Sequence, residues 1–403
     1  MRVSAIEVTS TADFCELRGY VSSDRDPDHE DWFDPFALWY RFPPWCAPFL
    51  SVDNGDPFLS ALLVPAMRTG EDLDISAPVS PRLLGALADI QNIYACFDQD
   101  ATPVTVDALP RPIAMSAGEP ASAGLYFSLG VDSFYSLLKN QRDHPNDARS
   151  VTHLIALHGW DVMYDDWNDQ FSPPILGNLQ RVANATGTTL VPVTTNVRRE
   201  CGRLASWVML HGAALASVAL ALGGCFHHAF IAASTTYDKL FPWGSHPVLD
   251  PLWSTENLRF VHDGCEMAII DKTASIAGWP LAMETLRPCA GYGQGYNCGR
   301  CLKCVRTMLD LYRVDALEQC ATLPHTIAPE VVRGALRGRH GPAHILNYQR
   351  RYDELRRRGA PPELLAVLAE HVATLKGKPP QPLPTHRRFV DAVTRHIGRG
   401  RLA

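Results

Sequence analysis

The segment from residue 124 to residue 234 most constrains the fold, because short apolar runs alternate there with longer stretches of helical periodicity. The runs GLYFSL, THLIALHG, TTLVPVTT and HHAFIAAS have the length of buried strands. Helical patterns separate them, most clearly VDSFYSLLKNQ and WVMLHGAALASVALAL. This alternation predicts an α/β fold with a doubly wound parallel sheet. Ligand-binding residues of such sheets lie at the carboxyl ends of the strands, which here means residues 128–133, 158–166, 194–199 and 234–255.

The regions on either side of this segment have a different character. The first 110 residues or so mix aromatic, proline and acidic residues, and the runs PFLSALLVPAM and ALPRPIAM predict strands of an α+β unit. RTMLDLYRVDALEQC and PPELLAVLAEHVATLK predict helices, and KGKPPQPLP predicts an extended arm. We therefore expect an N-terminal α+β accessory domain over 1–118, an α/β domain over 119–315 and a helical, arginine-rich C-terminal region over 316–403.

Composition excludes several classes of protein. The 403 residues are 46% hydrophobic and 20% charged, as in ordinary globular proteins. A net charge of −6 argues against a constitutive nucleic-acid-binding protein, which needs a basic face. The N-terminus MRVSAIEVTS lacks the apolar core of a secretory signal, and no apolar run reaches the roughly 18 residues of a membrane span. We expect a cytoplasmic protein with no membrane partner, and the sequence leaves open whether it forms a homodimer.

Four of the eleven cysteines crowd into LRPCAGYGQGYNCGRCLKC. Their spacing is C-x8-C-x2-C-x2-C, and the two short steps bend the chain so that three thiolates can face one ion. The glycine-rich excursion allows the fourth thiolate to complete a tetrahedron. We predict a structural zinc site, because four protein ligands leave no open position for water. An iron–sulfur cluster also suits this spacing and stays an alternative. The predicted ligands are Cys289, Cys298, Cys301 and Cys304.

A short segment between the first strand and the following helix has the character of an anion-binding loop. Backbone N–H groups and the positive end of a helix face outward at such a junction. Ser128 and Ser133 add hydroxyl donors, and Asp132 could hold Mg²⁺ or the loop itself. The Walker signature is absent, and the alternative is an ordinary turn with a serine cap. The predicted cofactor-binding loop consists of Ser128, Leu129, Gly130, Val131, Asp132 and Ser133.

This loop resembles the SGGxDS signature of the PP-loop ATP pyrophosphatases, whose fold is of the adenine nucleotide alpha hydrolase type. The cysteine spacing after the same kind of domain resembles the zinc site of the cyano-deazaguanine synthases of queuosine biosynthesis. The resemblance covers residues 124–307. Leu129 stands where that superfamily has a glycine, and a side chain there limits how closely the backbone can approach a phosphate.

The resemblance implies an ATP-dependent ligase that uses ATP, Mg²⁺ and Zn²⁺. A carboxylate or carbonyl oxygen of a small, purine-like or deazapurine-like substrate would attack the α-phosphorus and release pyrophosphate. Ammonia would then displace AMP and leave an amide, and a second adenylation, on the amide oxygen, followed by loss of AMP would give a nitrile. Two alternatives remain: transfer of sulfur through a cysteine such as Cys201 or Cys265, and a catalytically inactive nucleotide-binding scaffold that Leu129 would favour.

The same resemblance suggests further site residues. At the ends of the second and third strands, contacts to the nucleotide are expected from His158, Asp161, Thr195 and Arg198. Asp132, Ser133, Lys272 and Asp250 are the catalytic candidates, with Lys272 reaching a transition-state phosphate and Asp250 lying in the substrate loop. Trp243 and Trp253 could stack on a planar substrate. The alternatives are a surface arginine, a solvated lysine and a tryptophan mini-core.

Overall fold

The structure is a computed structural model that describes residues 1–112, 122–160, 172–289, 296–337 and 343–377. Two compact units make up the chain. Unit 1 comprises Met1–Phe127, Lys139–Ala233 and Leu240–Asp263, and unit 2 comprises Ser128–Leu138, Ser234–Lys239 and Gly264–Ala403. The units do not follow the limits of the three regions predicted from the sequence, which remain a prediction about domains.

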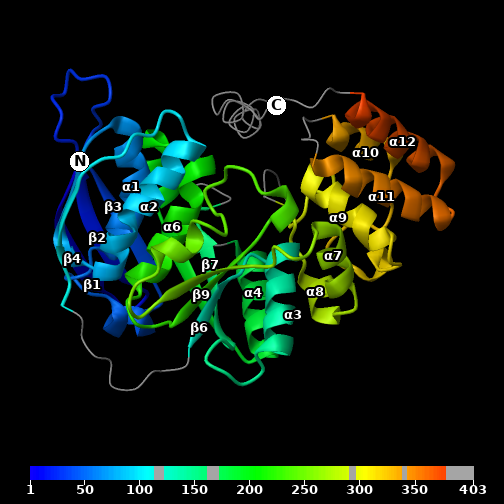
Figure 1. Cartoon of the computed structure of the whole chain (residues 1–403). Coiled ribbons are helices and arrows are strands. Elements are labelled where there is room, and N and C mark those ends of the chain that lie inside the picture. Colours follow the sequence, from blue (N-terminus) through cyan, green and yellow to red (C-terminus); the bar gives the residue numbers. More distant parts are fainter. Residues whose placement is uncertain (113–121, 161–171, 290–295, 338–342, 378–403) are drawn as a thin grey trace. The chain divides into compact units, whose positions relative to one another are not determined.

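All strands of the described residues lie in unit 1 and form one sheet (Figure 1). They are β1 (Arg2–Ser10), β2 (Cys15–Ser22), β3 (Phe36–Phe42), β4 (Leu73–Val79), β5 (Val106–Pro110), β6 (Ala123–Tyr126), β7 (Val151–His158), β8 (Thr189–Thr195), β9 (His228–Ala232) and β10 (Arg259–Asp263). Their order in the sheet is β10-β9-β6-β7-β8-β3-β2-β1-β4-β5. Neighbours are parallel except at β8–β3, β3–β2 and β2–β1. The predicted α/β class with a mostly parallel sheet is confirmed.

The parallel part of the sheet contains the four strands predicted between residues 124 and 234. They are β6, β7, β8 and β9, and β10 follows. Their order is β8-β7-β6-β9-β10, which is 3-2-1-4-5 in chain order. The direction of winding therefore reverses between β6 and β9. In open α/β sheets, ligands bind beside such a reversal, outside the carboxyl ends of the strands.

The strands of the first 110 residues extend this same sheet. β3 pairs antiparallel with the end of β8, and the Oγ1 of Thr195 donates to the carbonyl of Trp39 over 2.7 Å. The side chain of Asn196 continues the pairing beyond β8. It accepts from Trp39 N over 3.0 Å and donates to the carbonyl of Ala37 over 2.7 Å. The N-terminal strands are thus joined to the parallel strands through main-chain and side-chain hydrogen bonds.

The helices of unit 1 include one that the sequence analysis assigned wrongly. The run PFLSALLVPAM, predicted to be a strand, lies in α1, where nearly every residue is buried. A continuous apolar run has no periodicity that separates a strand from a buried helix. Pro57 fits the first helical turn, and Gly70 ends the helix at φ +65°. The helices are α1 (Asp56–Thr69), α2 (Pro81–Phe97), α3 (Val131–Asp143), which begins in unit 2, α4 (Pro173–Thr186), α5 (Val197–Leu204) and α6 (Trp207–Ala221).

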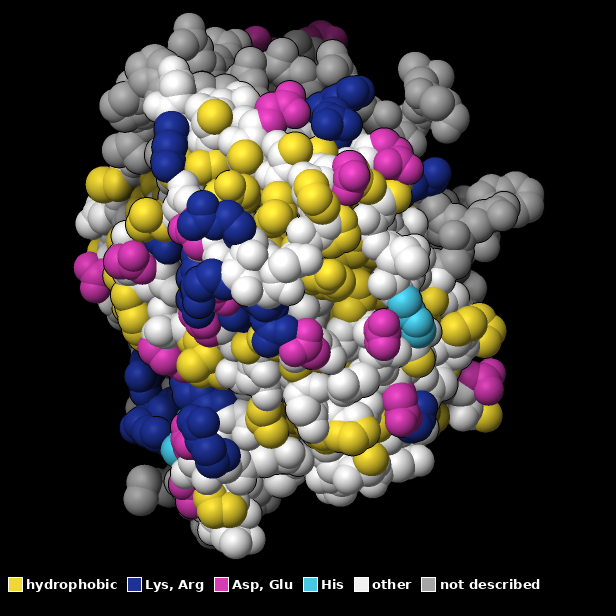
Figure 2. Space-filling model, turned by 90° about the vertical axis from the view of Figure 1, so that its right-hand side faces the viewer, with side chains coloured by type: hydrophobic (Ala, Val, Ile, Leu, Met, Phe, Trp, Pro, Cys, Tyr) yellow, Lys and Arg dark blue, Asp and Glu magenta, His cyan; other side chains and the backbone are white. Residues whose placement is uncertain are grey.

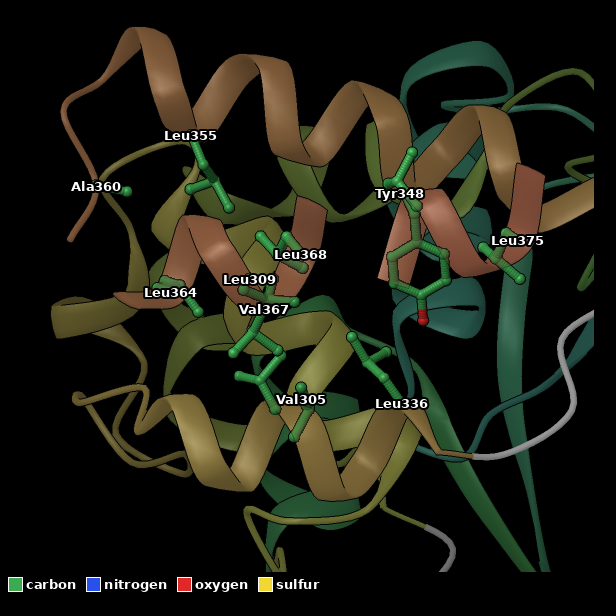
Figure 3. Close-up of a cluster of buried hydrophobic side chains, with 12 residues drawn as sticks. Val305, Leu309, Leu336, Tyr348, Leu355, Ala360, Leu364, Val367, Leu368 and Leu375 are labelled. Atoms are coloured by element: carbon green, nitrogen blue, oxygen red, sulfur yellow. The ribbon is translucent and has the colours of Figure 1, made fainter. Parts of the chain in front are cut away.

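Unit 2 is helical in its described residues. Its helices are α7 (Ile269–Ala277), α8 (Pro280–Thr285), α9 (Leu302–Tyr312), α10 (Pro329–Leu336), α11 (Ala343–Arg357) and α12 (Pro362–Lys376). Figure 3 shows Val305, Leu336, Tyr348 and Val367 converging from α9, α10, α11 and α12 on one buried cluster. The helix predicted at 361–376 corresponds to α12. The helix predicted at 306–320 is confirmed only as far as Tyr312, where α9 ends. The extended arm predicted from KGKPPQPLP lies almost wholly outside the described residues.

Charged side chains of both signs share the surface of this unit. Figure 2 shows Lys and Arg side chains gathered in a band, with Asp and Glu among them. Exposed arginines of α10 and α11 pair with acids, as in Arg350 with Asp271 at 2.6 Å and Arg333 with Glu370 at 3.6 Å. In the described part of α10 and α11, these exposed arginines therefore belong to a solvated surface that carries both charges. The described residues also form the short helices η1 (Pro44–Phe49), η2 (Tyr237–Lys239), η3 (Asp250–Trp253) and η4 (Leu317–Gln319).

Among the helices that the structure describes, none combines the length and the hydropathy needed to cross a membrane.

Candidate functional site

The segment 128–133 directly follows β6 and leads into α3. Leu129 holds φ at +62°, in the left-handed region that glycine adopts without strain. Its side chain is fully buried, and its carbonyl accepts from Arg287 N over 2.7 Å. The Ser133 hydroxyl donates to the Gly130 carbonyl over 3.0 Å and accepts from Ser128 N over 3.4 Å. The first N–H groups of α3 have no partner within the helix, so the segment can receive an anion.

A buried lysine pairs with the aspartate of this segment. The Nζ of Lys272, in α7, lies 3.0 Å from Asp132 Oδ1, although 140 positions separate the two residues in the chain. The Lys272 side chain is 1% exposed and that of Asp132 is 29% exposed. The pair therefore carries its positive charge inward and its negative charge at the surface of the segment. The structure brings together two residues that the sequence analysis proposed separately as catalytic.

A tyrosine and a glutamate, both missed by the sequence analysis, extend this network. The Lys272 ammonium lies over the Tyr135 ring, 5.5 Å from its centre, and the Tyr135 hydroxyl donates to Glu266 Oε1 over 2.8 Å. Gly264 follows β10 at φ +93°, and a Cβ there would lie 3.2 Å from Lys272 Nζ. A glycine is therefore required where the lysine approaches the backbone. No local pattern in the sequence marks Tyr135 or Glu266, because they meet only in the fold.

A recess of about 430 Å³ adjoins Glu266. The loop after β9 supplies one wall, including η2, and the loop after β10 supplies another. Tyr237 is 60% exposed, so its aromatic ring is available to a ligand. The recess thus combines an aromatic face with groups of both charges. Its lining residues are Thr236, Tyr237, Asp238, Lys239, Cys265, Glu266, Ala268, Asp271, Asn347 and Arg350.

Arg287 is a second cation beside the segment, also missed from the sequence. Its backbone N–H donates to Leu129, and a Cβ added to Gly130 would lie 3.9 Å from the Arg287 carbonyl oxygen. The residue is 9% exposed, and its buried Nε has no hydrogen-bond partner in the described part of the chain. In the sequence, Arg287 is marked only by its position two residues before Cys289. That position suggests a role beside the cysteines rather than beside residues 128–133.

The four predicted cysteine ligands form a cluster that could hold a metal ion such as zinc. Their four sulfur atoms all lie within 4.8 Å of one another. The Cys298 and Cys304 sulfurs are 4.0 Å apart, and those of Cys289 and Cys301 are 3.9 Å apart. A tetrahedral zinc ion with Zn–S bonds of about 2.3 Å separates its ligands by roughly 3.8 Å. The donor set and its spacing therefore fit one tetrahedral ion.

Local backbone geometry shapes this knuckle. Gly299 lies between two of the cysteines at φ +67°, where a Cβ would lie only 2.7 Å from Pro324 Cγ. The Asn297 side chain donates to the carbonyls of Leu286 and Thr322, over 2.9 and 3.0 Å. Cys301 caps α9, and its sulfur accepts from the backbone N–H of Cys304. The knuckle is therefore attached both to α9 and to the stretch that follows α8.

The thiols of the cluster influence one another's protonation. A hydrogen bond with the Cys304 thiol lowers the pKa of Cys301 to about 5, and the same contact raises the pKa of Cys304. Burial raises the pKa of Cys298. Four sulfurs this close cannot all ionise unless a cation offsets their mutual repulsion.

Asp250, the remaining catalytic candidate, lies in unit 1 and is fully buried. It accepts hydrogen bonds from the Ser245 hydroxyl over 2.8 Å and from His246 N over 3.2 Å, and His262 Nδ1 is 2.7 Å away. Gly244 brings this loop against α6 so closely that a Cβ would lie 2.2 Å from the Met209 carbonyl oxygen. These contacts make Asp250 an organiser of its loop, and its catalytic role stays a prediction.

The predicted nucleotide contacts at the ends of β7 and β8 also belong to unit 1. His158 and Thr195 are buried at the last positions of their strands, and Thr195 is engaged in the β3–β8 pairing. Arg198 donates to the Trp160 carbonyl and stacks on Trp207 at 5.1 Å. Asp161 lies outside the described residues. Arg198 is therefore a buried packing residue here rather than a surface arginine.

Several other sequence candidates are buried. Trp253 is 0% exposed, so the predicted stacking on a substrate is wrong for this residue, and Trp243 packs against His211 and Phe241. Burial raises the pKa of Cys201, and Cys265 is 1% exposed. The raised pKa of Cys201 is opposite to what a sulfur carrier needs, whereas Cys265 is among the residues that line the recess beside Glu266.

No protein family, curated protein or solved structure matches this chain.

Proposed function

We propose that the chain binds ATP at residues 128–133 and adenylates a small substrate, acting as a ligase related to the PP-loop ATP pyrophosphatases. The observation that carries the proposal is the pairing of Lys272 with Asp132 at the start of α3. The pair places a lysine and a carboxylate next to the outward N–H groups of a helix, and these are the groups that phosphate recognition uses.

The place of the loop along the chain supports the proposal that it binds a nucleotide. The loop follows β6, the strand beside which the order 3-2-1-4-5 reverses, and ligands of open α/β sheets bind at that place. The buried side chain of Leu129 also supports it. Although Leu replaces the glycine of the superfamily, its backbone adopts the left-handed conformation of a glycine and its side chain points away from solvent. The backbone can thus approach a phosphate.

The proposed chemistry has two steps. A carboxylate or carbonyl oxygen of the substrate attacks the α-phosphorus, and the bond from that phosphorus to the bridging oxygen of pyrophosphate breaks. Ammonia then attacks the adenylated carbon, and AMP leaves. Lys272 and the loop N–H groups offset negative charge on the phosphates, a contribution that is largest in a site screened from water. Mg²⁺, when bound, would neutralise the phosphates, and Asp132 is the carboxylate that could face it.

The recess beside Glu266 is the proposed place of the substrate. Tyr135 and Glu266 connect it to Lys272 through the contacts described above. Tyr237 offers an aromatic ring on which a planar heterocycle can stack. A volume of about 430 Å³ suits a small molecule rather than a polymer. We therefore favour a purine-like or deazapurine-like acid.

For the cysteine cluster we propose Zn²⁺ in a structural role. The sulfur atoms approach one another too closely to enclose the several iron and sulfide ions of an iron–sulfur cluster. Four thiolates also leave no open coordination position, so the metal would hold the knuckle and would not enter the reaction. Sulfur transfer through Cys265, which lines the recess but is 1% exposed, and the inactive scaffold are the two alternatives that the test must separate from the ligase.

The test is substrate-dependent release of pyrophosphate from magnesium-ATP by the purified protein, with purine and deazapurine carboxylic acids and ammonium. Lys272→Met should lower the rate about 100-fold or more, since removing one group that stabilises a transition state costs this much. Lys139→Met is the matched control, because Lys139 forms an equivalent pair with Asp263 at 2.8 Å in unit 1.

Four outcomes separate the hypotheses. Release that depends on substrate and on Lys272 supports the ligase. Release that requires sulfide instead of ammonium supports sulfur transfer. A protein that binds ATP and releases no pyrophosphate with any of these substrates is the inactive scaffold, and one that does not bind ATP at all contradicts the nucleotide site.

A further inference from the structure

We infer that Arg287 is a phosphate-binding residue, which holds the terminal phosphates of the nucleotide and the pyrophosphate that leaves. This inference rests on the proposed function, because it assigns a ligand to the same loop. Its own basis is different, however. It comes from a buried charge that the described protein does not balance.

The guanidinium of Arg287 is an unusual group to bury. Arginine stays protonated at any pH that a protein tolerates, so it cannot escape burial by losing its charge. Burying an unpaired ion is strongly unfavourable, and buried arginines are therefore normally paired with acids. Arg351, which is also buried in unit 2, follows this rule with two hydrogen bonds of 2.6 and 2.7 Å to Asp310.

Arg287 departs from the rule. Within the described residues it has neither an acid partner nor a hydrogen bond to its Nε, although only 9% of the residue is exposed. Such a group is expected where a ligand supplies the missing negative charge. The planar guanidinium matches phosphate oxygens with two parallel donors, which a lysine cannot do.

The location selects the ligand. The backbone of Arg287 is bonded to Leu129, and Gly130 lies against its carbonyl. Its flexible side chain thus starts from the wall of the loop that the nucleotide phosphates are proposed to occupy. Lys272 already shares its charge with Asp132, whereas Arg287 has no acid partner among the described residues and can pair with a phosphate of higher negative charge. Pyrophosphate and the β- and γ-phosphates of ATP are such groups.

The neighbouring cysteine cluster offers a competing explanation. Four thiolates around Zn²⁺ carry a net charge of −2, and Arg287 lies two positions from Cys289. If Arg287 served this cluster, its loss would lower zinc content. The experiment therefore measures bound zinc and phosphate affinity in the same protein preparations.

The test compares wild type with Arg287→Met, Arg287→Lys and Arg337→Met. Met keeps the apolar stem without the charge, and Arg337 is an exposed arginine at the end of α10. Affinity for inorganic pyrophosphate and for ATP is measured by calorimetry, together with the melting temperature without ligand and the zinc stoichiometry.

We expect Arg287→Met to weaken pyrophosphate binding about tenfold or more, the effect of losing hydrogen bonds from a charged donor. Arg287→Lys should lie between Met and wild type, and Arg337→Met should bind as wild type does. Zinc should stay stoichiometric. The melting temperature of ligand-free Arg287→Met should be unchanged or higher, because an unbalanced buried charge has been removed.

Equal affinity in wild type and Arg287→Met overturns the inference while leaving the proposed function intact. So does a loss of zinc or a lower melting temperature that accounts for the weaker binding. Conversely, Arg287-dependent binding of pyrophosphate without any binding of ATP upholds the inference and removes the proposed function. If wild type binds neither pyrophosphate nor ATP, both are wrong.

Discussion

Leu129 carries a backbone conformation that its side chain disfavours. A non-glycine residue at φ +62° costs about 1–3 kcal/mol, and such residues cluster at functional sites. The side chain compensates by full burial. At this residue, the backbone strain destabilises the fold and the burial of the side chain stabilises it. Substitutions can separate these two contributions to the free energy of unfolding.

Leu129→Ala should lower the free energy of unfolding by about 2–5 kcal/mol, the usual cost of removing a buried leucine side chain. Leu129→Gly should be about 1 kcal/mol more stable than the alanine variant, since glycine adopts a positive φ without strain. Denaturant titrations of both variants provide the measurement.

The matched control is Leu137, which is equally buried but lies inside α3. There the order should be reversed, with glycine about 0.8–1.0 kcal/mol less stable than alanine. The same order at both positions would show that Leu129 is not held in the left-handed region.

At the scale of elements, the knuckle at 298–304 depends on one glycine. Gly299→Ala should destabilise the protein by about 1–3 kcal/mol and weaken zinc binding, because alanine at φ +67° is strained and its Cβ meets Pro324. Gly278→Ala is the control, since Gly278 has a negative φ and open space around it.

Melting temperature and zinc stoichiometry are measured before and after treatment with a chelator. If the cluster holds zinc as proposed, a chelator should lower the melting temperature of wild type, since a bound metal would join the start of α9 to Cys289. Two results contradict this: a melting temperature unaffected by the chelator, or a Gly299→Ala protein that retains wild-type zinc affinity.

Elements were predictable from the sequence where a pattern is local. The four parallel strands and the four cysteines were predicted because apolar runs and short cysteine spacings are visible within a few residues. α1 was assigned wrongly because its apolar run has no period. The Lys272–Asp132 and Tyr135–Glu266 contacts could not be predicted as pairs, since more than a hundred positions separate the partners. Asp250 was recognised as a polar loop residue, but its complete burial depends on the packing of Gly244 against α6.

At the scale of the whole molecule, buried and half-buried histidines contribute to the response of stability to acid. His153, His211, His228 and His246 all lie in unit 1, and burial lowers the pKa of each. In the unfolded chain their pKa is about 6.5, so the unfolded state binds more protons below this pH. The contribution of these histidines to the free energy of unfolding should be constant above pH 7. It should fall as the pH drops through about 6.5.

The free energy of unfolding is measured at several pH values between 7.5 and about 5.5, from denaturant titrations that use tryptophan fluorescence as the probe. His153→Phe should make the pH dependence shallower, because Phe keeps the ring contacts with Trp45 and Phe226 and cannot be protonated. A slope that is unchanged by this variant would assign the pH dependence to other groups.

The pairing of β3 with β8 has a consequence for how the protein is made. Thr195 and Trp39, which meet at this pairing, are 156 positions apart. At 5–20 residues per second, a ribosome needs on the order of ten seconds or more to synthesise the residues between β3 and its partner strand β8. During that time the nascent chain presents an open strand edge to its neighbours on the polysome. Slowing translation between these positions should therefore lower the yield of native protein, and a chaperone that shields strand edges should restore it.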